Sequence, residues 1–156
     1  MAIEIERKFL LSGDGWRRQV TSSSFLRQGY LGGDGVSVRV RIDDDMANLN
    51  IKSRTPGIAR SEFEYAIPLA DAYALLALVE GPMLEKVRHR VEYAGHVWEI
   101  DEFGGDNAGL VVAEIELDRV DESFERPDWI GLEVTDDIRY YNLNLSREPY
   151  SRWSEC

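Results

Sequence analysis

The sequence predicts a mainly β protein of the α+β class: an eight-stranded antiparallel barrel with an ionic lumen and a few flanking helices. Eight segments alternate apolar with charged or polar residues, a period of two that places successive side chains on opposite faces of a strand. Short turns join most of these segments, as they join antiparallel neighbours. The polar faces concentrate arginine, lysine or glutamate instead of the loose mixture typical of solvent. We therefore expect them to line the inside of a closed barrel.

The first segment, Met1–Leu11, shows this pattern at the start of the chain. Its charged side chains fall on one face and its apolar side chains on the other: Glu4, Glu6 and Lys8 against Ile3, Ile5 and Phe9. A helix would also bring Glu4 and Lys8 together, but it would turn Glu6 away from both. Because the same alternation returns in later segments, the strand is favoured.

The other strand predictions run along most of the chain. They are Phe25–Leu31, Val36–Ile42, Ala47–Arg54, Arg60–Ile67, Glu85–Tyr93, Val97–Phe103 and Leu110–Asp118. One helix is predicted over Leu69–Glu80, which carries an apolar stripe and is stopped by Gly81 and Pro82. We expect residues 12–24 to form a loop with a short helical turn. Residues 119–156 should form helical pieces, of which 134–145 closes over the interior.

The composition is that of a single globular domain, residues 1–156, with 44% hydrophobic and 30% charged residues. No apolar run approaches the ~20 residues of a membrane span, and the charged N-terminus lacks a secretory signal. We therefore expect a cytoplasmic protein without a membrane partner. The lone cysteine, Cys156, excludes an internal disulfide. A formal net charge of −11 argues against a nucleic-acid partner, and the oligomeric state stays open, a homodimer included.

The predicted lumen holds charges of both signs. The cations are Arg39, Arg41, Lys52, Lys86 and Arg88, and the carboxylates are Glu4, Glu6, Glu62, Glu64, Glu99, Asp101, Glu114 and Glu116. Some of these charges should simply pair with each other. The carboxylates, however, occur in couples two residues apart, which repel on one strand face. Such couples suit Mg²⁺ or Mn²⁺ shared with phosphates, and the arginine couple suits phosphate oxygens, so we expect a polyanionic ligand that carries a metal.

The barrel also predicts which side chains are shielded. The lumenal residues Arg39, Arg41, Lys52 and Glu116 should be protected from solvent. The outward apolar residues Val38, Val40 and Ile51 should pack under helices.

A series of motifs follows the same order along nearly the whole chain. It comprises EIERK at 4–8, RQGYL at 27–31, VRVRI at 38–42, NIKSR at 50–54, RSEFEY at 60–65, EKVRHR at 85–90, EIDEF at 99–103, AEIELD at 113–118 and LEVTDDIRYYN at 132–142. EIERK matches the ExExK signature of the CYTH superfamily, the triphosphate tunnel metalloenzymes. The ordered set is similar to the short, single-domain bacterial members of that superfamily.

This resemblance implies a metal-dependent triphosphatase whose tunnel holds a small-molecule triphosphate together with Mg²⁺ or Mn²⁺. The activities known in the family are inorganic tripolyphosphatase, thiamine triphosphatase and class IV adenylate cyclase. Carried over by motif, the metal ligands are Glu4, Glu6, Glu62, Glu114 and Glu116. The phosphate-binding residues are Lys8, Arg39, Arg41, Lys52, Lys86 and Arg88. Tyr30 matches a tyrosine assigned as a proton acceptor, and Lys8 and Lys52 join it as catalytic residues.

Two features of the sequence qualify the match. Where close bacterial members have a lysine-flanked RYKNK segment, this chain has Tyr140, Tyr141, Asn142 and Leu143 after Arg139. Without these lysines, we expect the segment to close less tightly over the substrate or to change which substrate enters. Strand parity also places Arg27 and Tyr30 on opposite faces, and we favour Tyr30 inside.

The leading hypothesis is hydrolysis of inorganic tripolyphosphate to pyrophosphate and phosphate. The runner-up is nucleoside or thiamine triphosphate chemistry, or adenylate cyclisation, for which the sequence shows no evident base pocket. A non-enzymatic alternative is a module that binds polyphosphate or nucleotide. Carboxylates on both the first and the last predicted strand argue against the binding module, because pure binding could rely on basic residues alone.

Overall fold

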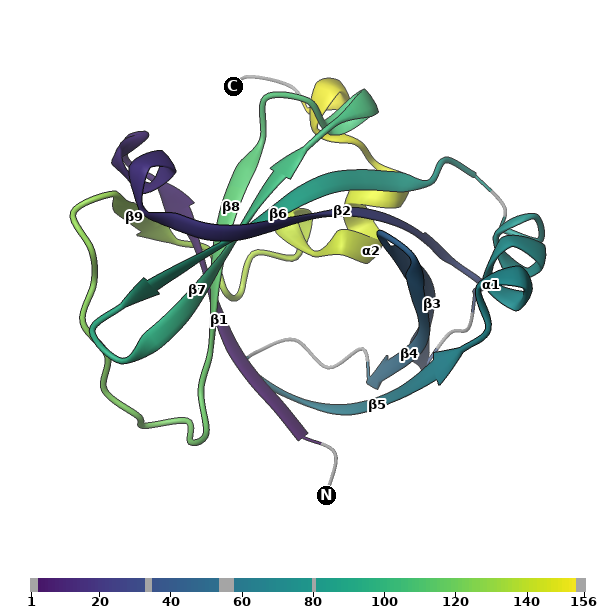
Figure 1. The fold of residues 1–156 in the computed structure, drawn as a ribbon, viewed down its shortest axis with the longest axis horizontal. Helices are drawn as coiled ribbons and strands as arrows, with labels where there is room; N and C mark the ends of the chain where they lie inside the picture. The colour runs from purple at the N-terminus through teal and green to yellow at the C-terminus, as the bar shows by residue number, and fades with distance from the viewer. Residues whose placement is uncertain (1–2, 33–34, 54–57, 80, 154–156) are drawn as a thin grey trace.

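One antiparallel sheet curls into a closed tunnel in the computed structural model, which describes residues 3–32, 35–53, 58–79 and 81–153 (Figure 1). Its strands are β1 (Ile3–Leu11), β2 (Val20–Tyr30), β3 (Val36–Asp43), β4 (Met46–Ser53), β5 (Ala59–Ile67), β6 (Leu84–Tyr93), β7 (His96–Phe103), β8 (Val111–Glu116) and β9 (Ile130–Glu133). The order is β5-β4-β3-β2-β6-β7-β8-β1-β9, and β1 also pairs with β5. This last pairing, which joins residues 3–5 to residues 59–61, closes the eight-stranded barrel.

The predicted barrel is confirmed, with corrections at its margins. Residues 20–24, expected as a loop, extend β2 because they pair with β6. The short β9 lies in a region predicted to be helical, and it pairs with β1. The predicted ends Met1, Arg54 and Glu80 lie outside the described residues.

The described residues form two α-helices beside the sheet, together with four short 3₁₀ turns at 15–19, 105–107, 138–140 and 150–152. The first, α1 (Leu69–Leu76), is shorter than predicted; the second is α2 (Asn142–Arg147). None of the described helices is long and apolar enough to cross a membrane.

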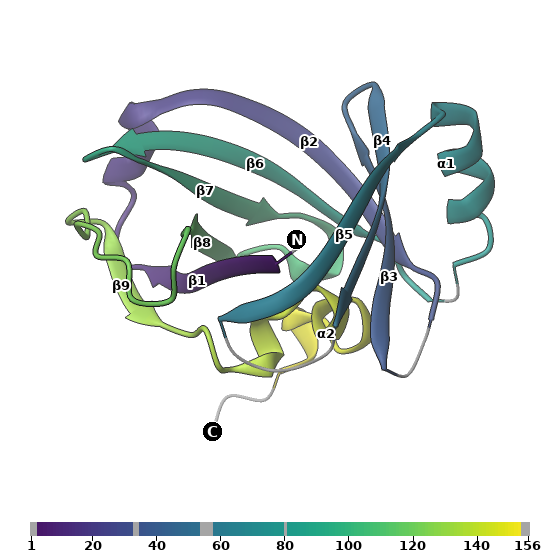
Figure 2. The same ribbon diagram turned by 90° about the horizontal axis from the view of Figure 1, so that it is seen from below.

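The outward apolar face is covered in two places. Around β1, β7 and β8 a cluster of aromatic and aliphatic side chains packs beneath residues 117–130, with Phe9 and Trp98 in edge-to-face contact at 5.6 Å. On the other side α1 covers β3 and β4 through Val40 and Ala72 (Figure 2). A Cβ on Gly29 would lie 2.8 Å from Val79 Cγ2, so glycine permits the close approach of this segment to β2.

Helices do not cover the whole outer wall. Of the three residues expected beneath them, only Val40 belongs to the cluster under α1, whereas Val38 and Ile51 are half-buried outside it. Farther along β5, Phe63 and Tyr65 are exposed. The expectation of a helix-covered outer face is therefore wrong for part of β3–β5.

One end of the tunnel is plugged from inside. There α2 contacts β2 and β6 (Figure 2). Its buried Leu145 packs against Leu84, Phe103 and Val112 of the barrel strands and against Leu110, which directly precedes β8. The lumen is thus apolar around Leu145 of α2 and ionic elsewhere, which limits the site to the ionic stretch.

Candidate active site in the tunnel

The strand register places the charged faces of the barrel opposite one another. Lys52 on β4 is the cross-strand partner of Glu62 on β5, and Arg88 on β6 is the partner of Asp101 on β7. Between β1 and β8 the partners are Glu6 and Glu116, two residues of like charge. The register therefore neutralises some lumenal charges and concentrates others.

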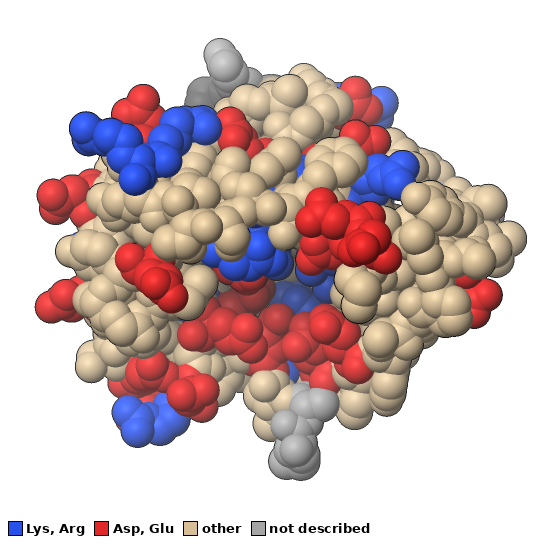
Figure 3. Space-filling model, viewed as in Figure 1, with Lys and Arg blue, Asp and Glu red and all other residues tan. Residues whose placement is uncertain are grey.

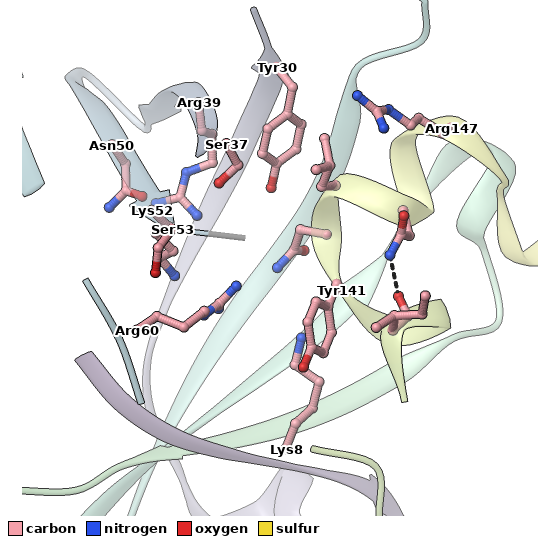
Figure 4. A pocket seen from close by; sticks show the side chains of 14 residues that line it. Lys8, Tyr30, Ser37, Arg39, Asn50, Lys52, Ser53, Arg60, Tyr141 and Arg147 are labelled. Carbon is pink, nitrogen blue, oxygen red and sulfur yellow. Dashed lines mark hydrogen bonds between the residues drawn. The ribbon is translucent and has the colours of Figure 1, made fainter. Parts of the chain in front are cut away.

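Two adjoining cavities occupy the lumen. The first, the cationic cavity, has a volume of about 240 Å³ and is lined under α2 by residues that include Lys8, Tyr30, Arg39, Lys52, Arg60 and Tyr141 (Figure 4). The second, the acidic cavity, has a volume of about 420 Å³ and is lined by residues that include Glu4, Glu6, Glu62, Glu99, Glu114, Glu116, Arg41 and Arg88. Figure 3 shows a hollow with acidic side chains at its rim and basic ones deeper. Arg39, Lys52 and Asn142 line both cavities and join them.

Arg39 and Arg41 are buried cations without a carboxylate partner among the described residues. They are 6% and 8% exposed. Arg41 Nε donates a hydrogen bond to Gln28 Oε1 at 2.9 Å, and Arg39 Nε has no hydrogen-bond acceptor in the described part of the chain. Burial, with the positive charges of Arg39 and Arg88, lowers the pKa of Arg41 to about 9. This couple presents uncompensated positive charge to the lumen.

Lys86 and Arg88 lie in the same lumen but are neutralised. Lys86 Nζ is 2.7 Å from Asp101 Oδ2, while Arg88 Nε and Nη2 donate to the two carboxylate oxygens of Asp101 at 2.8 and 2.9 Å. Burial opposes ionisation of Asp101, but Arg88 and Lys86 hold its pKa well below its usual range. Asp101 was expected in the lumen but not among the site residues, and its contacts position two of the six predicted phosphate-binding residues.

Two lumenal carboxylates, Glu4 of β1 and Glu116 of β8, are incompletely neutralised. Glu4 Oε1 lies 2.9 Å from Lys52 Nζ. Burial, with the charge of Glu6, still raises the pKa of Glu4 to about 8. Burial also raises the pKa of Glu116, with Glu62 and Glu6 adding to the effect. Contrary to expectation, Glu116 is exposed, because it ends β8 at the open side of the tunnel.

The donor set of this acidic region fits a hard divalent cation. The carboxylates offer only oxygen, and burial together with the negative charges of neighbouring glutamates raises the pKa values of Glu4 and Glu116. No group of three or more acidic, histidine or cysteine side chains within the described ranges is arranged to hold a metal by itself. A bound ion would therefore take one or two carboxylates and complete its shell with substrate oxygens and water, as Mg²⁺ commonly does.

The three predicted catalytic residues line the cationic cavity together. Lys8 Nζ donates to the carbonyl oxygen of Tyr140 at 3.0 Å and lies 3.4 Å from Glu114 Oε1. Tyr30 points into this cavity, where Figure 4 shows it beside Arg39. Arg27, on the opposite face of β2, donates to the Tyr73 hydroxyl of α1 at 3.1 Å. The parity of Tyr30 and Arg27 therefore agrees with the prediction.

The C-terminal segment closes the cationic cavity with mostly neutral side chains, to which Arg147 of α2 adds one cation. Tyr141, Asn142 and Leu143 line it, and Asn142 Oδ1 accepts a hydrogen bond from Lys86 at 3.0 Å. Residues 134–145 thus close over the interior as predicted. They do so through an amide and aromatic surface in the place of lysines.

Arg60 is the main site residue missing from the sequence prediction. Its guanidinium lies 3.5 Å from Glu4 Oε1 and 3.3 Å from Glu6 Oε1, and it lines the cationic cavity. Strand parity already placed it on one face with Glu62 and Glu64, so alternation could have identified it. Asn142 gave no comparable signal, because its position depends on the path of the C-terminal segment.

A closed antiparallel tunnel with uncompensated arginines beside mutually repelling carboxylates defines a class of protein that binds polyanions in its lumen. The CYTH domain family model matches residues 2–148, and the chain belongs to this family. It is 46% identical to a protein named inorganic triphosphatase from Acetivibrio thermocellus, over 99% of this chain and 100% of that relative. An inorganic triphosphatase from Nitrosomonas europaea is 35% identical over 92% and 96%. A crystal structure of an inorganic triphosphatase aligns with a TM-score of 0.65 at 34% identity, covering 92% of this chain and 97% of that one.

Proposed function

We propose that this protein is a divalent-metal-dependent triphosphatase that hydrolyses inorganic tripolyphosphate to pyrophosphate and phosphate. The observation that carries the proposal is the Arg39–Arg41 couple, two buried cations that no described carboxylate neutralises. Guanidinium groups bind phosphate oxygens in paired, charge-assisted hydrogen bonds. The similarity to two proteins named inorganic triphosphatase supports the same substrate class.

In this proposal Arg39, Arg41, Lys8 and Lys52 contact the triphosphate directly. They surround the junction of the two cavities, so a linear polyanion would meet positive charge along its length. Lys86 and Arg88 contribute less, because each already shares its charge with Asp101. The C-terminal segment excludes bulk water from the phosphates.

Glu4, Glu6 and Glu62 would hold Mg²⁺ or Mn²⁺ from one side of the acidic cavity, and Glu114 and Glu116 from the other. Such an ion, when bound, neutralises phosphate charge and lowers the pKa of a coordinated water. We assign Tyr30 as proton acceptor, since its side chain lines the cationic cavity together with Lys8 and Lys52. These two lysines would stabilise the charge that develops on the phosphate oxygens.

We also propose that residues 1–156 form one domain organised around this tunnel. The cavities of about 240 and 420 Å³ have the size of a small-molecule site. A nucleic-acid duplex, whose major groove alone is about 12 Å wide, would not enter them.

The test of the proposed function is a side-by-side assay of tripolyphosphate, ATP and thiamine triphosphate at matched free Mg²⁺ or Mn²⁺. We expect the highest kcat/KM with tripolyphosphate, because an ester removes an anionic terminal oxygen. A charge-assisted hydrogen bond contributes about 1.5–3 kcal/mol, so its loss lowers the rate roughly ten- to hundredfold. Faster ATP turnover, or cyclic AMP as the main product from ATP, would overturn the assignment.

A pair of variants separates catalysis from binding alone. Glu114→Gln combined with Glu116→Gln should abolish turnover at ordinary metal concentrations while the fold is retained. Arg27→Gln is the matched control, because Arg27 lies outside the barrel and bonds to Tyr73. If the double variant keeps wild-type activity, these carboxylates are structural.

A further inference from the structure

Arg60 connects the two halves of the site. It lies directly opposite Glu4 in the short β1–β5 pairing that closes the barrel. One of its nitrogens, Nη2, lies 3.5 Å from Glu4 Oε1 and 3.3 Å from Glu6 Oε1. Its side chain is only 16% exposed. A single guanidinium nitrogen thus bridges the two carboxylates of the first strand.

The same guanidinium has a second set of neighbours. Its central carbon lies 5.4 Å from the ring centroid of Tyr141, within the range of a cation–π contact. It also lines the cationic cavity with Arg39 and Lys52, and Figure 4 shows it extending toward Tyr141. In this one conformation Arg60 therefore lies between the carboxylates of β1 and the cationic cavity, in contact with both.

A divalent cation and this guanidinium compete for the same space. A metal ion held by both Glu4 and Glu6 would bind their oxygens at 2.0–2.6 Å, which is the position that Arg60 now bridges. Two positive groups that close repel each other strongly in a buried site. Either metal binding is weakened, or Arg60 turns away from the carboxylates.

We propose that Arg60 is a positioning residue that occupies the place of the divalent cation between Glu4 and Glu6 and couples metal binding to anion binding. A metal ion displaces the guanidinium toward Tyr141 and the cationic cavity, where it adds a phosphate contact. By reciprocity, an anion in that cavity draws Arg60 away from the carboxylates and tightens metal binding. This inference rests on the metal and triphosphate sites of the proposed function.

The first test measures Mn²⁺ binding without substrate, by the electron paramagnetic resonance signal of free Mn²⁺. Arg60→Gln should bind Mn²⁺ at least about fivefold more tightly than wild type, the lower end of typical coupling between sites. The same variant should bind metal-free tripolyphosphate more weakly, as measured by calorimetry in the presence of a chelator. A residue with a merely structural role would not move the two affinities in opposite directions.

Arg90→Gln is the matched control for loss of one lumenal charge. Arg90 lines the acidic cavity but donates to Ser24 Oγ at 3.0 Å, and it bridges no described pair of carboxylates. Its substitution should change the Mn²⁺ affinity less than about twofold. The long-range electrostatic effect of one lumenal charge is much smaller than that of a residue in contact with the metal ligands. If Arg90→Gln tightens Mn²⁺ binding as much as Arg60→Gln, or if Arg60→Gln binds Mn²⁺ no better than wild type, the proposal is wrong.

A second measurement uses the wild-type protein and so does not depend on the folding of a variant. Sulfate, a tetrahedral dianion and weak chelator of Mn²⁺, should tighten Mn²⁺ binding relative to chloride at equal ionic strength. An unchanged or weaker affinity in sulfate would refute the coupling. None of these readouts uses turnover. If the wild-type protein fails to hydrolyse tripolyphosphate, the proposed function is lost and the coupling through Arg60 is still decided by the Mn²⁺ isotherms.

Discussion

The two cation couples of the lumen, one on β3 and one on β6, differ in the partners that the fold gives them. Lys86 and Arg88 share Asp101 at distances of 2.7–2.9 Å. Arg39 and Arg41, equally buried, have no carboxylate partner in the described part of the chain. A buried charge without a counter-ion raises the free energy of the folded state. We therefore infer that the β6 couple is part of the wall of the tunnel and that the β3 couple binds the ligand.

The pKa values of the two arginines follow the same division. Burial lowers the pKa of Arg41 to about 9, and its positively charged neighbours add to the effect. Burial acts in the same direction on Arg88, but Asp101 raises its pKa well above the usual value. Arg41 and Arg88 thus differ, although both are arginines of the same lumen: Arg88 is neutralised by Asp101, and Arg41 is free to bind an anion. A buried cation therefore indicates ligand binding only where no carboxylate of the protein neutralises it.

The largest expected effect follows from removing the unpaired couple. Arg39→Gln with Arg41→Gln should lower kcat/KM for tripolyphosphate on the order of a hundred- to ten-thousandfold, since two charge-assisted contacts of about 1.5–3 kcal/mol each are lost. The unliganded variant should be at least as stable as wild type to urea, because two buried uncompensated charges are gone. A loss of activity below tenfold would show that this couple does not bind the substrate.

Removing the shared partner of the other couple should act on stability. Asp101→Asn keeps the shape but leaves Lys86 and Arg88 without a counter-ion. Breaking a buried pair in this way costs about 3–5 kcal/mol, so Tm should fall by roughly 6–20 °C in thermal unfolding. Glu102→Gln on the outer face of β7 is the control, since its ion pair with Arg17 is partly exposed and contributes little. If Tm falls equally in the Asp101→Asn and Glu102→Gln variants, Asp101 does not stabilise the β6 couple as argued.

The sequence predicts the barrel and the lumenal face because side-chain direction in a strand is a local property. It does not predict β9 or the first residues of β2, since both depend on partners distant in sequence. The serines at 22–24 look like a loop, and they become strand because they pair with residues 88–90 of β6. Ile130–Glu133 is too short for alternation to be recognised, and its partner β1 defines it.

The same limit applies to the site. Parity selects which residues face the lumen, and it would have added Arg60. It does not reveal that Asp101 binds both Lys86 and Arg88, because that depends on the register between β6 and β7. Nor does it show that Asn142 reaches Lys86 across 56 residues of sequence. The residues that line the lumen can be predicted from the sequence, whereas the partners that neutralise their charges depend on the tertiary structure.

The carboxylates repeat the contrast between paired and unpaired charge. Glu114 lies near Lys8 and Arg88, at 3.4 and 4.0 Å, and although burial opposes this, these cations lower its pKa to about 2. Glu4 lies 2.9 Å from Lys52 but beside Glu6 and Glu62, and burial with these like charges raises its pKa to about 8. Nearby cations therefore favour the ionised form of Glu114, whereas burial and like charges favour the protonated form of Glu4.

The smallest expected effect tests this difference through pH. A carboxyl whose folded pKa is raised contributes stability that is full below its ordinary pKa of 4.5 and is lost as pH rises through about 8. Glu4→Gln mimics the protonated carboxyl at every pH. Without divalent metal its Tm should match wild type near pH 5 and exceed it by at least about 2 °C at pH 9. Glu114→Gln should lower Tm by the same amount at both pH values, because Glu114 stays ionised throughout. A Glu4→Gln difference that does not grow with pH would show that Glu4 is ionised across this range.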